Sequence, residues 1–200
     1  MREIVSGIFT WPWFSARHGY NFNGYLVCDP GGNLCIDPVE PDGATLDEIA
    51  DLGVARVVVT NRNHVRAANA VHGRTGARTA IHSDDAAYAR SQGAVLDDAL
   101  HLGERIGPFI VVGVPGKSLG EIALHSPERR LLVVGDSVIG NPPGRCALLP
   151  EKVMDDPARL RTSVQQLLNL DFDTLLVGDG ESILSGAKER LRELVDTFET

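Results

Sequence analysis

The sequence predicts a mixed α+β fold in which two sheets pack together and the helices lie outside them. One observation is a pair of strands over residues 24–28 and 34–37, joined by the turn formers Asp29-Pro30-Gly31-Gly32-Asn33. A second is a later pair over residues 121–125 and 131–134. Strands and helices alternate around these hairpins, so the two halves of the chain repeat the same order. Because hairpins require antiparallel pairing, they argue against the alternative, a single doubly wound sheet.

Local signals define the other elements of the first half. Thr45-Leu46-Asp47-Glu48 is typical of a capping box, in which hydroxyl and carboxylate bond each other's unpaired amides, and Gly53 can end the helix that it starts. A run of three valines predicts a buried strand over residues 56–60. The remaining elements are a weak helix from about Arg66, a strand over 77–81 and a helix that Ser83 caps and that stops near Gly93.

The second half carries similar signals. Residues 109–114 form a predicted strand, and Asp156-Pro157 starts a helix with an acceptor at the cap and proline in the first turn. A further strand is predicted over 174–177. Apolar residues recur at helical spacing in two segments: Leu160, Val164, Leu167 and Leu168 in the first, and Ile183, Ala187, Leu191, Leu194, Val195 and Phe198 in the last. Together these elements predict one domain over residues 1–200.

Composition limits the classes of function. The chain of 200 residues is long enough to bury a core, and its apolar and charged fractions, 43% and 23%, are ordinary for a soluble globular protein. Its net charge is −8 and it has no lysine or arginine run, which argues against nucleic acid as the partner. No apolar run approaches the roughly 18 residues of a membrane-spanning helix, so we expect no membrane association.

The start of the chain and the cysteines indicate a cytoplasmic location. Met1-Arg2-Glu3-Ile4 lacks the apolar stretch of a secretory signal. Cys28, Cys35 and Cys146 are odd in number and include no CxxC pair. We expect buried, reduced thiols. The alternative is a disulfide between Cys28 and Cys35 across the first hairpin.

Several loop motifs follow one another in a recognisable order. The valine strand runs into Thr60-Asn61-Arg62-Asn63-His64-Val65-Arg66; then come Pro115-Gly116-Lys117-Ser118-Leu119-Gly120, a strand ending in Gly135-Asp136-Ser137, and Gly178-Asp179-Gly180. In this order they resemble the metal-binding loops of the metallo-β-lactamase superfamily, which read Thr-His-x-His-x-Asp-His, Pro-Gly-His-Ser/Thr-Pro-Gly, Gly-Asp and Gly-His-Gly. Gly24-Tyr25-Leu26-Val27 and Ile36-Asp37-Pro38 are also family-like, so the resemblance covers nearly the whole chain. It implies a four-layer αββα sandwich, the metallo-β-lactamase-like fold, with a site for two metal ions.

Most residues at the family's metal-binding positions are different here. Of seven ligand positions only Asp136, the bridging carboxylate, is kept; the six changed positions are Asn61, Asn63, Val65, Arg66, Lys117 and Asp179. Asparagine binds zinc poorly, and valine cannot bind it. Arg66 and Lys117 place positive charge where the cations would lie. We therefore expect no cofactor and no metal-dependent hydrolysis.

An alternative interpretation keeps one metal ion. His64 lies one residue beyond the second ligand position and could turn inward, so that His64, Asp136 and Asp179 would bind one divalent metal ion. The other interpretation of His64 is an exposed loop histidine. Gly135-Asp136-Ser137 also resembles the Gly-Asp-Ser nucleophile motif of certain esterases, but no histidine follows His125 to act as its base.

The charged residues of these loops suggest a replacement for the metal ions. In the family fold the loops meet at one edge of the sandwich, which would bring Arg66, Lys117, Asp136 and Asp179 together. Two carboxylates without a metal would repel each other. We therefore expect Lys117 to pair with Asp136, and Arg66 to pair with either carboxylate. The alternative is four separately solvated surface residues.

The function predicted from these residues is that of a family member that no longer hydrolyses and whose cleft binds a small anionic molecule or a protein partner. A hydrolase of ester, thioester or lactone-like substrates, with one metal ion or none, is the alternative; a structural role as a homo-oligomer is the third. An aromatic cluster is formed by Trp11-Pro12-Trp13-Phe14 with Tyr20, Phe22 and Tyr25. We expect it to pack in the core or at its rim; the alternative is a ligand-facing wall or an oligomer contact. The candidate cleft residues are Asn61, Asn63, His64, Arg66, Lys117, Asp136 and Asp179.

Overall fold

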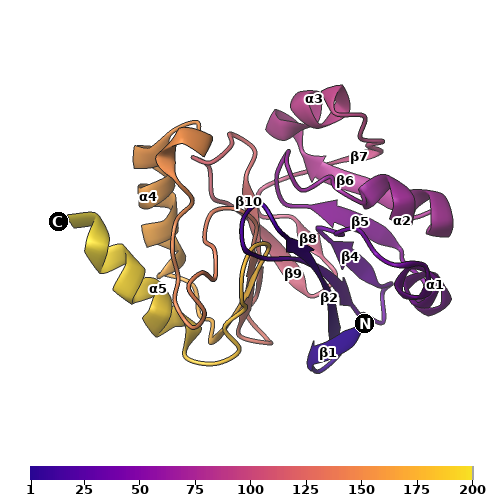
Figure 1. The fold of residues 1–200 in the computed structure, drawn as a ribbon, viewed down its shortest axis with the longest axis horizontal. Coiled ribbons are helices and arrows are strands. Elements are labelled where there is room, and N and C mark those ends of the chain that lie inside the picture. The colour runs from indigo at the N-terminus through magenta and orange to yellow at the C-terminus, as the bar shows by residue number, and fades with distance from the viewer. Residues whose placement is uncertain (200) are drawn as a thin grey trace. The chain divides into compact units, whose positions relative to one another are not determined.

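The computed structural model describes residues 1–199, which separate into two compact units, Met1–His101 and a second that begins at Leu102. Each unit has its own sheet and its own helices (Figure 1). The predicted mixed α+β class with two sheets is confirmed. The prediction that residues 1–200 form a single domain stays a prediction.

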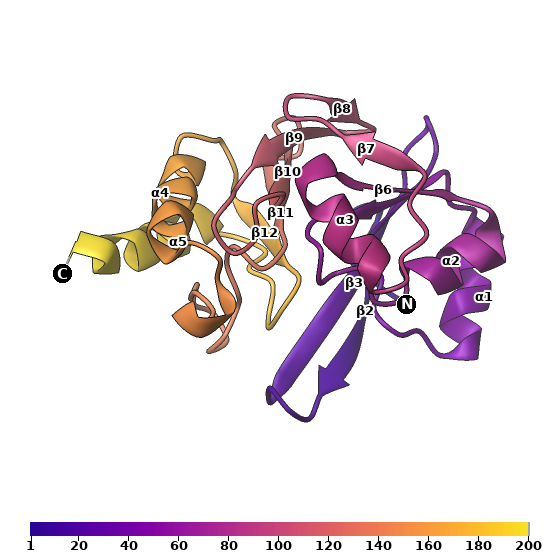
Figure 2. The ribbon, with the colours of Figure 1, turned by 90° about the horizontal axis from the view of Figure 1, so that it is seen from above.

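The sheet of the first unit has seven strands in chain order, β1 to β7. Its first half is antiparallel through β4, and β4 to β7 run parallel. Figure 2 shows β2 and β3 as a long ribbon that extends past the other strands of this sheet. The strands are β1 (Arg2–Val5), β2 (Ile8–Ser15), β3 (Tyr20–Val27), β4 (Leu34–Ile36), β5 (Arg56–Val59), β6 (Arg78–His82) and β7 (Asp98–Leu100).

The predicted hairpin over residues 24–37 is confirmed as β3 paired with β4. Sequence analysis did not predict β2, which pairs with β3 along its full length from Ile8 opposite Val27 to Ser15 opposite Tyr20. The aromatic run in β2 passes from buried to exposed along the strand, since residues 12–14 are exposed in succession. Trp11 is buried and donates its indole N–H to the carbonyl of Val39 at 3.0 Å, whereas Trp13 and Phe14 are exposed. The core-packing interpretation is therefore confirmed for Trp11, and contact of the exposed residues with a ligand or a second copy stays a prediction.

The helices of this unit are α1 (Gly43–Leu52), α2 (Ala68–Thr75) and α3 (Ser83–Ser91). The predicted capping box is wrong, because the carboxylate of Asp42 lies earlier in the chain and accepts the amide of Thr45 at 2.7 Å. The helix therefore starts at residue 43, and it ends at Gly53 as predicted. Similarly, α3 is capped by His82, whose ring accepts from the amide of Asp84, rather than by Ser83. Apolar side chains of both sheet and helices form the core: Trp11, Leu26, Cys35, Val39, Ile49, Val57, Val59, Ala68, Val71, Ala77, Ile81 and Ala89.

The sheet of the second unit has five strands in the order β12-β11-β10-β9-β8. Neighbours from β8 to β11 are antiparallel, and β12 runs parallel to β11. The predicted hairpin over residues 121–134 is confirmed as β10 and β11, with Ala123 opposite Val134. The strands are β8 (Arg105–Ile106), β9 (Phe109–Gly113), β10 (Ile122–Ser126), β11 (Leu131–Val134) and β12 (Thr174–Val177).

Two helices, α4 (Pro157–Leu167) and α5 (Ala187–Val195), belong to this second sheet (Figure 1). Short 3-10 turns lie at Glu151–Val153 and Asp196–Glu199. The predicted start of α4 is confirmed: Asp156 accepts the amide of Arg159 at 2.9 Å, and Pro157 opens the first turn. By contrast α5 begins later than its apolar spacing suggested. Ile183 is hydrogen-bonded to Leu175 of the sheet instead, which holds it outside the helix.

The three cysteines are free, as expected, and no disulfide joins Cys28 to Cys35. Only Cys35 is fully buried; Cys28 and Cys146 are partly buried. Within residues 1–199 the structure has no helix with the length and apolarity needed to cross a membrane.

The thiols lead to a first prediction. Burial raises the pKa of the Cys35 thiol, with the charge of Asp37 adding to the effect, and burial also raises the pKa of Cys146 to about 12. Because the thiolate is the reactive form, neither thiol should react with a disulfide reagent such as DTNB at pH 8 in the native protein, and both should react once the chain is unfolded. Cys28→Ser should then remove any fast native reaction. A fast reaction that disappears in Cys35→Ser instead would contradict this prediction.

Candidate functional site

The loop that follows β5 turns His64 into the interior. The side-chain oxygen of Asn61 accepts the amide of Asn63 at 2.8 Å, and the amide of His64 donates to the carbonyl of Asn61 at 3.0 Å. These two bonds form a tight turn. His64 is fully buried as a result, so the interpretation of an exposed loop histidine is wrong.

His64 bonds to the buried carboxylate of Asp37. Its Nδ1 lies 2.8 Å from Oδ2 of Asp37. The same Oδ2 accepts the hydroxyl of Thr60 at 2.5 Å, and Oδ1 accepts the amide of Thr60 at 2.8 Å. Asp37 and Thr60 follow the neighbouring parallel strands β4 and β5, so their backbones meet at the carboxyl ends of both strands. Nδ1 of His64 and the hydroxyl of Thr60 thus share one oxygen of this carboxylate.

The other candidates of this loop have different roles. Asn61 is buried and its side chain is used in the turn, while Asn63 is exposed. The guanidinium of Arg66 lies over the ring of Phe22, 4.1 Å from the ring centroid. This geometry is a cation–π contact. The expected pairing of Arg66 with Asp136 or Asp179 stays a prediction.

In the second unit, Lys117 forms the expected pair with Asp136. Its Nζ lies 2.5 Å from Oδ2 of Asp136, and the two side chains are only 5% and 7% exposed. The loop that carries Lys117 is held against the start of α4, since the carbonyls of Gly116 and Lys117 accept the amides of Asp156 and Asp155. Gly116 has a φ of 142°, and a Cβ there would lie 2.3 Å from the backbone nitrogen of Leu160. Only glycine permits this close approach.

A second buried carboxylate, Glu121, holds the loop of Asp136. Its Oε1 accepts the amide of Asp136 at 2.7 Å and the amide of Ser137 at 3.0 Å. Glu121 is not among the residues that the sequence predicted for the site. The sequence did hold a signal, since Glu121 directly precedes the apolar strand that runs from Ile122. A carboxylate at that place is expected to be buried, and a buried charge requires a partner.

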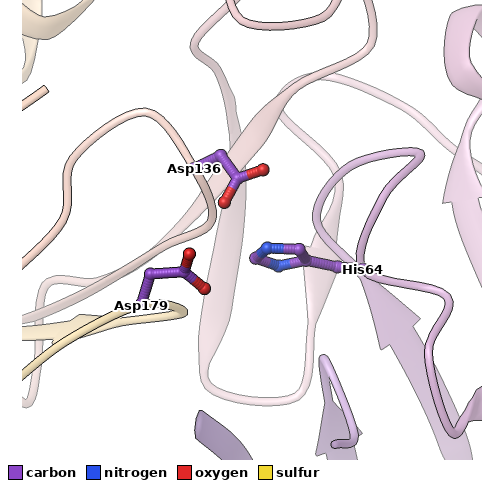
Figure 3. Close-up of side chains that lie close together, drawn as sticks. All are labelled: His64, Asp136 and Asp179. Carbon is purple, nitrogen blue, oxygen red and sulfur yellow. The ribbon is translucent and has the colours of Figure 1, made fainter. Parts of the chain in front are cut away.

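Asp179 lies beside Asp136 because β11 and β12 are parallel neighbours. Each aspartate follows the end of its strand, and the candidate ligand oxygens of the two carboxylates are within 4.8 Å of each other (Figure 3). The amide of Gly140 donates to the carbonyl of Asp179 at 2.9 Å, which ties the loop after Asp136 to the turn of Asp179. A Cβ on Gly140 would meet the carbonyl oxygen of Glu181 at 1.9 Å, so the two loops are in close backbone contact.

His64, Asp136 and Asp179 are the residues that the sequence offered as ligands of one metal ion, and Figure 3 shows their side chains. His64 belongs to the first unit, and both aspartates belong to the second. All three are buried. An imidazole nitrogen and two carboxylates are donors that zinc, iron and manganese accept.

The chain is similar to proteins of known family. A family model described as the metallo-β-lactamase superfamily matches residues 4–198. A hydroxyacylglutathione hydrolase of Thermosynechococcus vestitus is 32% identical over 164 residues, which are 75% of this chain and 60% of that protein. The chain thus spans less than two thirds of the length of this relative.

Solved structures share the fold at low identity. A protein in a di-iron-bound form has a TM-score of 0.70 and is 23% identical, with 90% of this chain and 98% of that chain covered. The metallo-β-lactamase FIM-1 of Pseudomonas aeruginosa, in its mono-zinc form, has a TM-score of 0.76 and is 17% identical, with 98% and 94% covered. At these identities the comparison establishes the fold, and it confirms the predicted metallo-β-lactamase-like class.

The expectation that no cofactor is needed is wrong. Proteins of the same fold are found with two iron ions or with one zinc ion, and this chain has a group of potential metal ligands of its own. A changed residue at a family position does not always remove a ligand. At position 179 a carboxylate, which also binds metals, replaces a histidine, and the turn at Asn61 brings His64 inward although it lies one residue beyond a ligand position.

Proposed function

The chain belongs to the metallo-β-lactamase superfamily, and on this premise we propose that it hydrolyses a small anionic ester or thioester with the help of one divalent metal ion. The hydrolase class is supported by the relatives named hydroxyacylglutathione hydrolase. The single ion is supported by the buried pair of Lys117 and Asp136, which is the observation that carries the proposal.

The residues present fit one metal ion. His64, Asp136 and Asp179 would hold it, and three protein ligands leave room for a water molecule, as in catalytic zinc sites. The bonded Nδ1 of His64 is typical of a metal-binding histidine, whose other nitrogen faces the metal. A bound divalent ion would supply a Lewis acid that polarises a carbonyl and lowers the pKa of a water molecule.

The same residues do not fit two ions. The ammonium of Lys117 already lies 2.5 Å from one oxygen of Asp136, the carboxylate that bridges both ions in the family. A second divalent ion at that carboxylate would be repelled by the buried ammonium. Lys117 would instead contribute its own positive charge, which favours an anionic substrate and the negative charge that develops on a carbonyl oxygen during hydrolysis.

A second candidate function is the binding of a small anion or a protein partner without hydrolysis. It is favoured by Trp13 and Phe14 of β2, which are 43% and 62% exposed and could contact a partner. A homo-oligomer would use the same kind of surface. The net charge of −8 supports a partner other than nucleic acid, and we include a cytoplasmic location without membrane association in the proposal.

Metal content and hydrolysis test the proposal together. Chelator-treated protein should bind one equivalent of Zn²⁺ or Mn²⁺ in a calorimetric titration, and it should hydrolyse hydroxyacyl thioesters only when the metal is present. Asp179→Asn should weaken metal binding by more than the roughly 10- to 100-fold that outer-shell changes cause. Asp171→Asn is the matched control, because that carboxylate is exposed and pairs with Arg130.

Three experimental results would each contradict a different part of the proposal. Two equivalents of metal would overturn the single-ion site. Metal binding without hydrolysis of any tested ester, thioester or lactone would favour the second candidate function. Unchanged metal binding in Asp179→Asn would show that the ion binds elsewhere.

A further inference from the structure

We propose that the protein associates with a second copy of itself, by placing the tip of its β2–β3 ribbon against a groove beside α1 of the other copy. The arm is this ribbon, and the arm tip is residues 13–17. Arm and groove both belong to the first unit. The inference goes beyond the proposed hydrolysis and does not depend on it, because neither surface contains His64, Asp136 or Asp179.

The arm carries exposed aromatic side chains on both of its faces. Trp13 lies opposite Phe22, with the ring centroids 5.7 Å apart. Phe14, the next residue, points to the other face of the ribbon, where it lies opposite Asn21. The arm extends past the other strands of its sheet (Figure 2), so those strands do not cover its tip. Large apolar side chains that stay exposed in this way mark a surface for interaction.

The arm is positively charged, although the chain as a whole has a net charge of −8. Residues 4–28 contain no aspartate and no glutamate, and they include Arg17 and His18. Arg17 is exposed, and within the described part of the chain its guanidinium has no ion-pair partner. An aromatic surface with an unpaired cation fits a partner surface that is apolar and acidic.

A groove with these properties lies beside α1. Its volume is about 580 Å³, and it is lined by Phe9, Ala44, Asp47, Glu48, Asp51 and Leu52. Asp47 pairs with Arg74 at 3.0 Å. Glu48 pairs with the ammonium of Met1 at 2.6 Å. Asp51 is exposed, and no cation of residues 1–199 pairs with it. The groove therefore offers apolar side chains and one carboxylate that is available to a cation of another molecule.

The occupant that these charges favour is a second copy, because every copy carries both surfaces. In the contact Arg17 of one copy faces Asp51 of the other, and Phe14 is covered by the groove. If both copies insert their arms into each other, the contact closes into a dimer; otherwise it repeats into longer chains. Stable complexes bury at least about 1,200 Å² in total, more than two aromatic side chains cover, so we expect weak, concentration-dependent association.

Sedimentation velocity of the chelator-treated protein, from micromolar to millimolar concentration, tests the proposal. The mean mass should rise with concentration from the monomer to the dimer or beyond. Acrylamide quenching of tryptophan fluorescence should fall over the same range, because Trp11 is buried and Trp13 is the exposed one of the two tryptophans. A protein that remains monomeric throughout would overturn the proposal, in favour of a different occupant for both surfaces.

Two charge reversals give the sharpest test. Arg17→Glu and Asp51→Arg should each raise the dissociation constant by about tenfold or more, because like charges then face each other. An effect of net charge alone predicts opposite changes, since Arg17→Glu moves the net charge of −8 further from zero and Asp51→Arg brings it closer. An equimolar mixture of the two variants should associate nearly as the parent does, because each reversed surface meets its reversed counterpart. A misfolded variant would not recover on mixing.

Phe14→Ala tests the apolar part of the contact and should raise the dissociation constant by about tenfold. Two controls lie in the second unit: Glu193→Arg makes the same charge change in the last turn of α5, and Leu102→Ala removes an exposed apolar side chain. Both should keep the dissociation constant of the parent within about twofold. If the arm variants weaken association and Asp51→Arg does not, the arm tip contacts a surface other than this groove. Equal effects of variants and controls would also overturn the proposal.

Discussion

Replacing Lys117 with alanine is expected to lower the free energy of unfolding by about 3–5 kcal/mol at pH 7 in the presence of a chelator. The substitution leaves the carboxylate of Asp136, 7% exposed, without its cationic partner. Removing one member of a buried pair costs more than the pair itself contributes, because an uncompensated charge stays in a region of low dielectric. Urea denaturation of parent and variant measures the difference.

Two further variants separate this effect from loss of packing. Lys117→Met with Asp136→Asn removes both charges at similar volume, and it should recover most of the lost stability. Arg105→Ala removes a cation from an exposed pair with Glu128, whose side chains are 55% and 62% exposed, and should cost less than about 1 kcal/mol. A Lys117→Ala protein as stable as the parent would contradict a buried ion pair at this position.

Zn²⁺ should change how much the substitution Lys117→Ala lowers the free energy of unfolding. A divalent ion bound at Asp136 neutralises the same carboxylate, and a ligand that binds only the folded state stabilises it. The stability lost by the variant should therefore be partly restored by Zn²⁺, and by more than Zn²⁺ adds to the parent. Equal stabilisation of both proteins would argue against competition between the lysine and the metal ion.

The pair of Lys117 and Asp136 could be predicted because both residues lie in motifs whose place in the family fold is known. The loops after β9 and β11 keep their glycines, Gly116 and Gly135, so the resemblance located them even though one side chain had changed. The element types were also readable, since apolar period and turn residues indicate strands and helices locally.

Residues that act through long-range contacts could not be predicted in the same way. Asp37 and His64 are separated by 27 residues, and Glu121 and the amide of Asp136 by 15. Asp37 was noted only as a family-like residue after a strand, because no local pattern shows which side chain a buried carboxylate will meet. Helix starts were missed for a related reason: Asp42 and His82 compete with Thr45 and Ser83 for the same unpaired amides.

Glu121→Ala is expected to lower the free energy of unfolding by about 3–5 kcal/mol. Two buried amides, those of Asp136 and Ser137, lose the acceptor that both share, and each unsatisfied buried group costs about 1–3 kcal/mol. The loop between β11 and the bridge at Ile139 should loosen, since Glu121 links it to β10. Urea denaturation gives the stability, and hydrogen exchange of the amides of Asp136 and Ser137 should quicken beyond the change expected from global stability alone.

Glu121→Gln distinguishes the acceptor from the charge. A glutamine carbonyl can accept both amides, so this variant should keep their protection from exchange and lose clearly less stability than the alanine variant. Glu128→Ala, which removes an exposed glutamate at the β10–β11 turn, should change stability by less than about 1 kcal/mol and leave both amides protected. If Glu121→Gln exchanges as fast as Glu121→Ala, the shared acceptor is not what holds this loop. The position of Asp136 would then depend on Lys117 and on the backbone contact of Gly140 with the turn of Asp179.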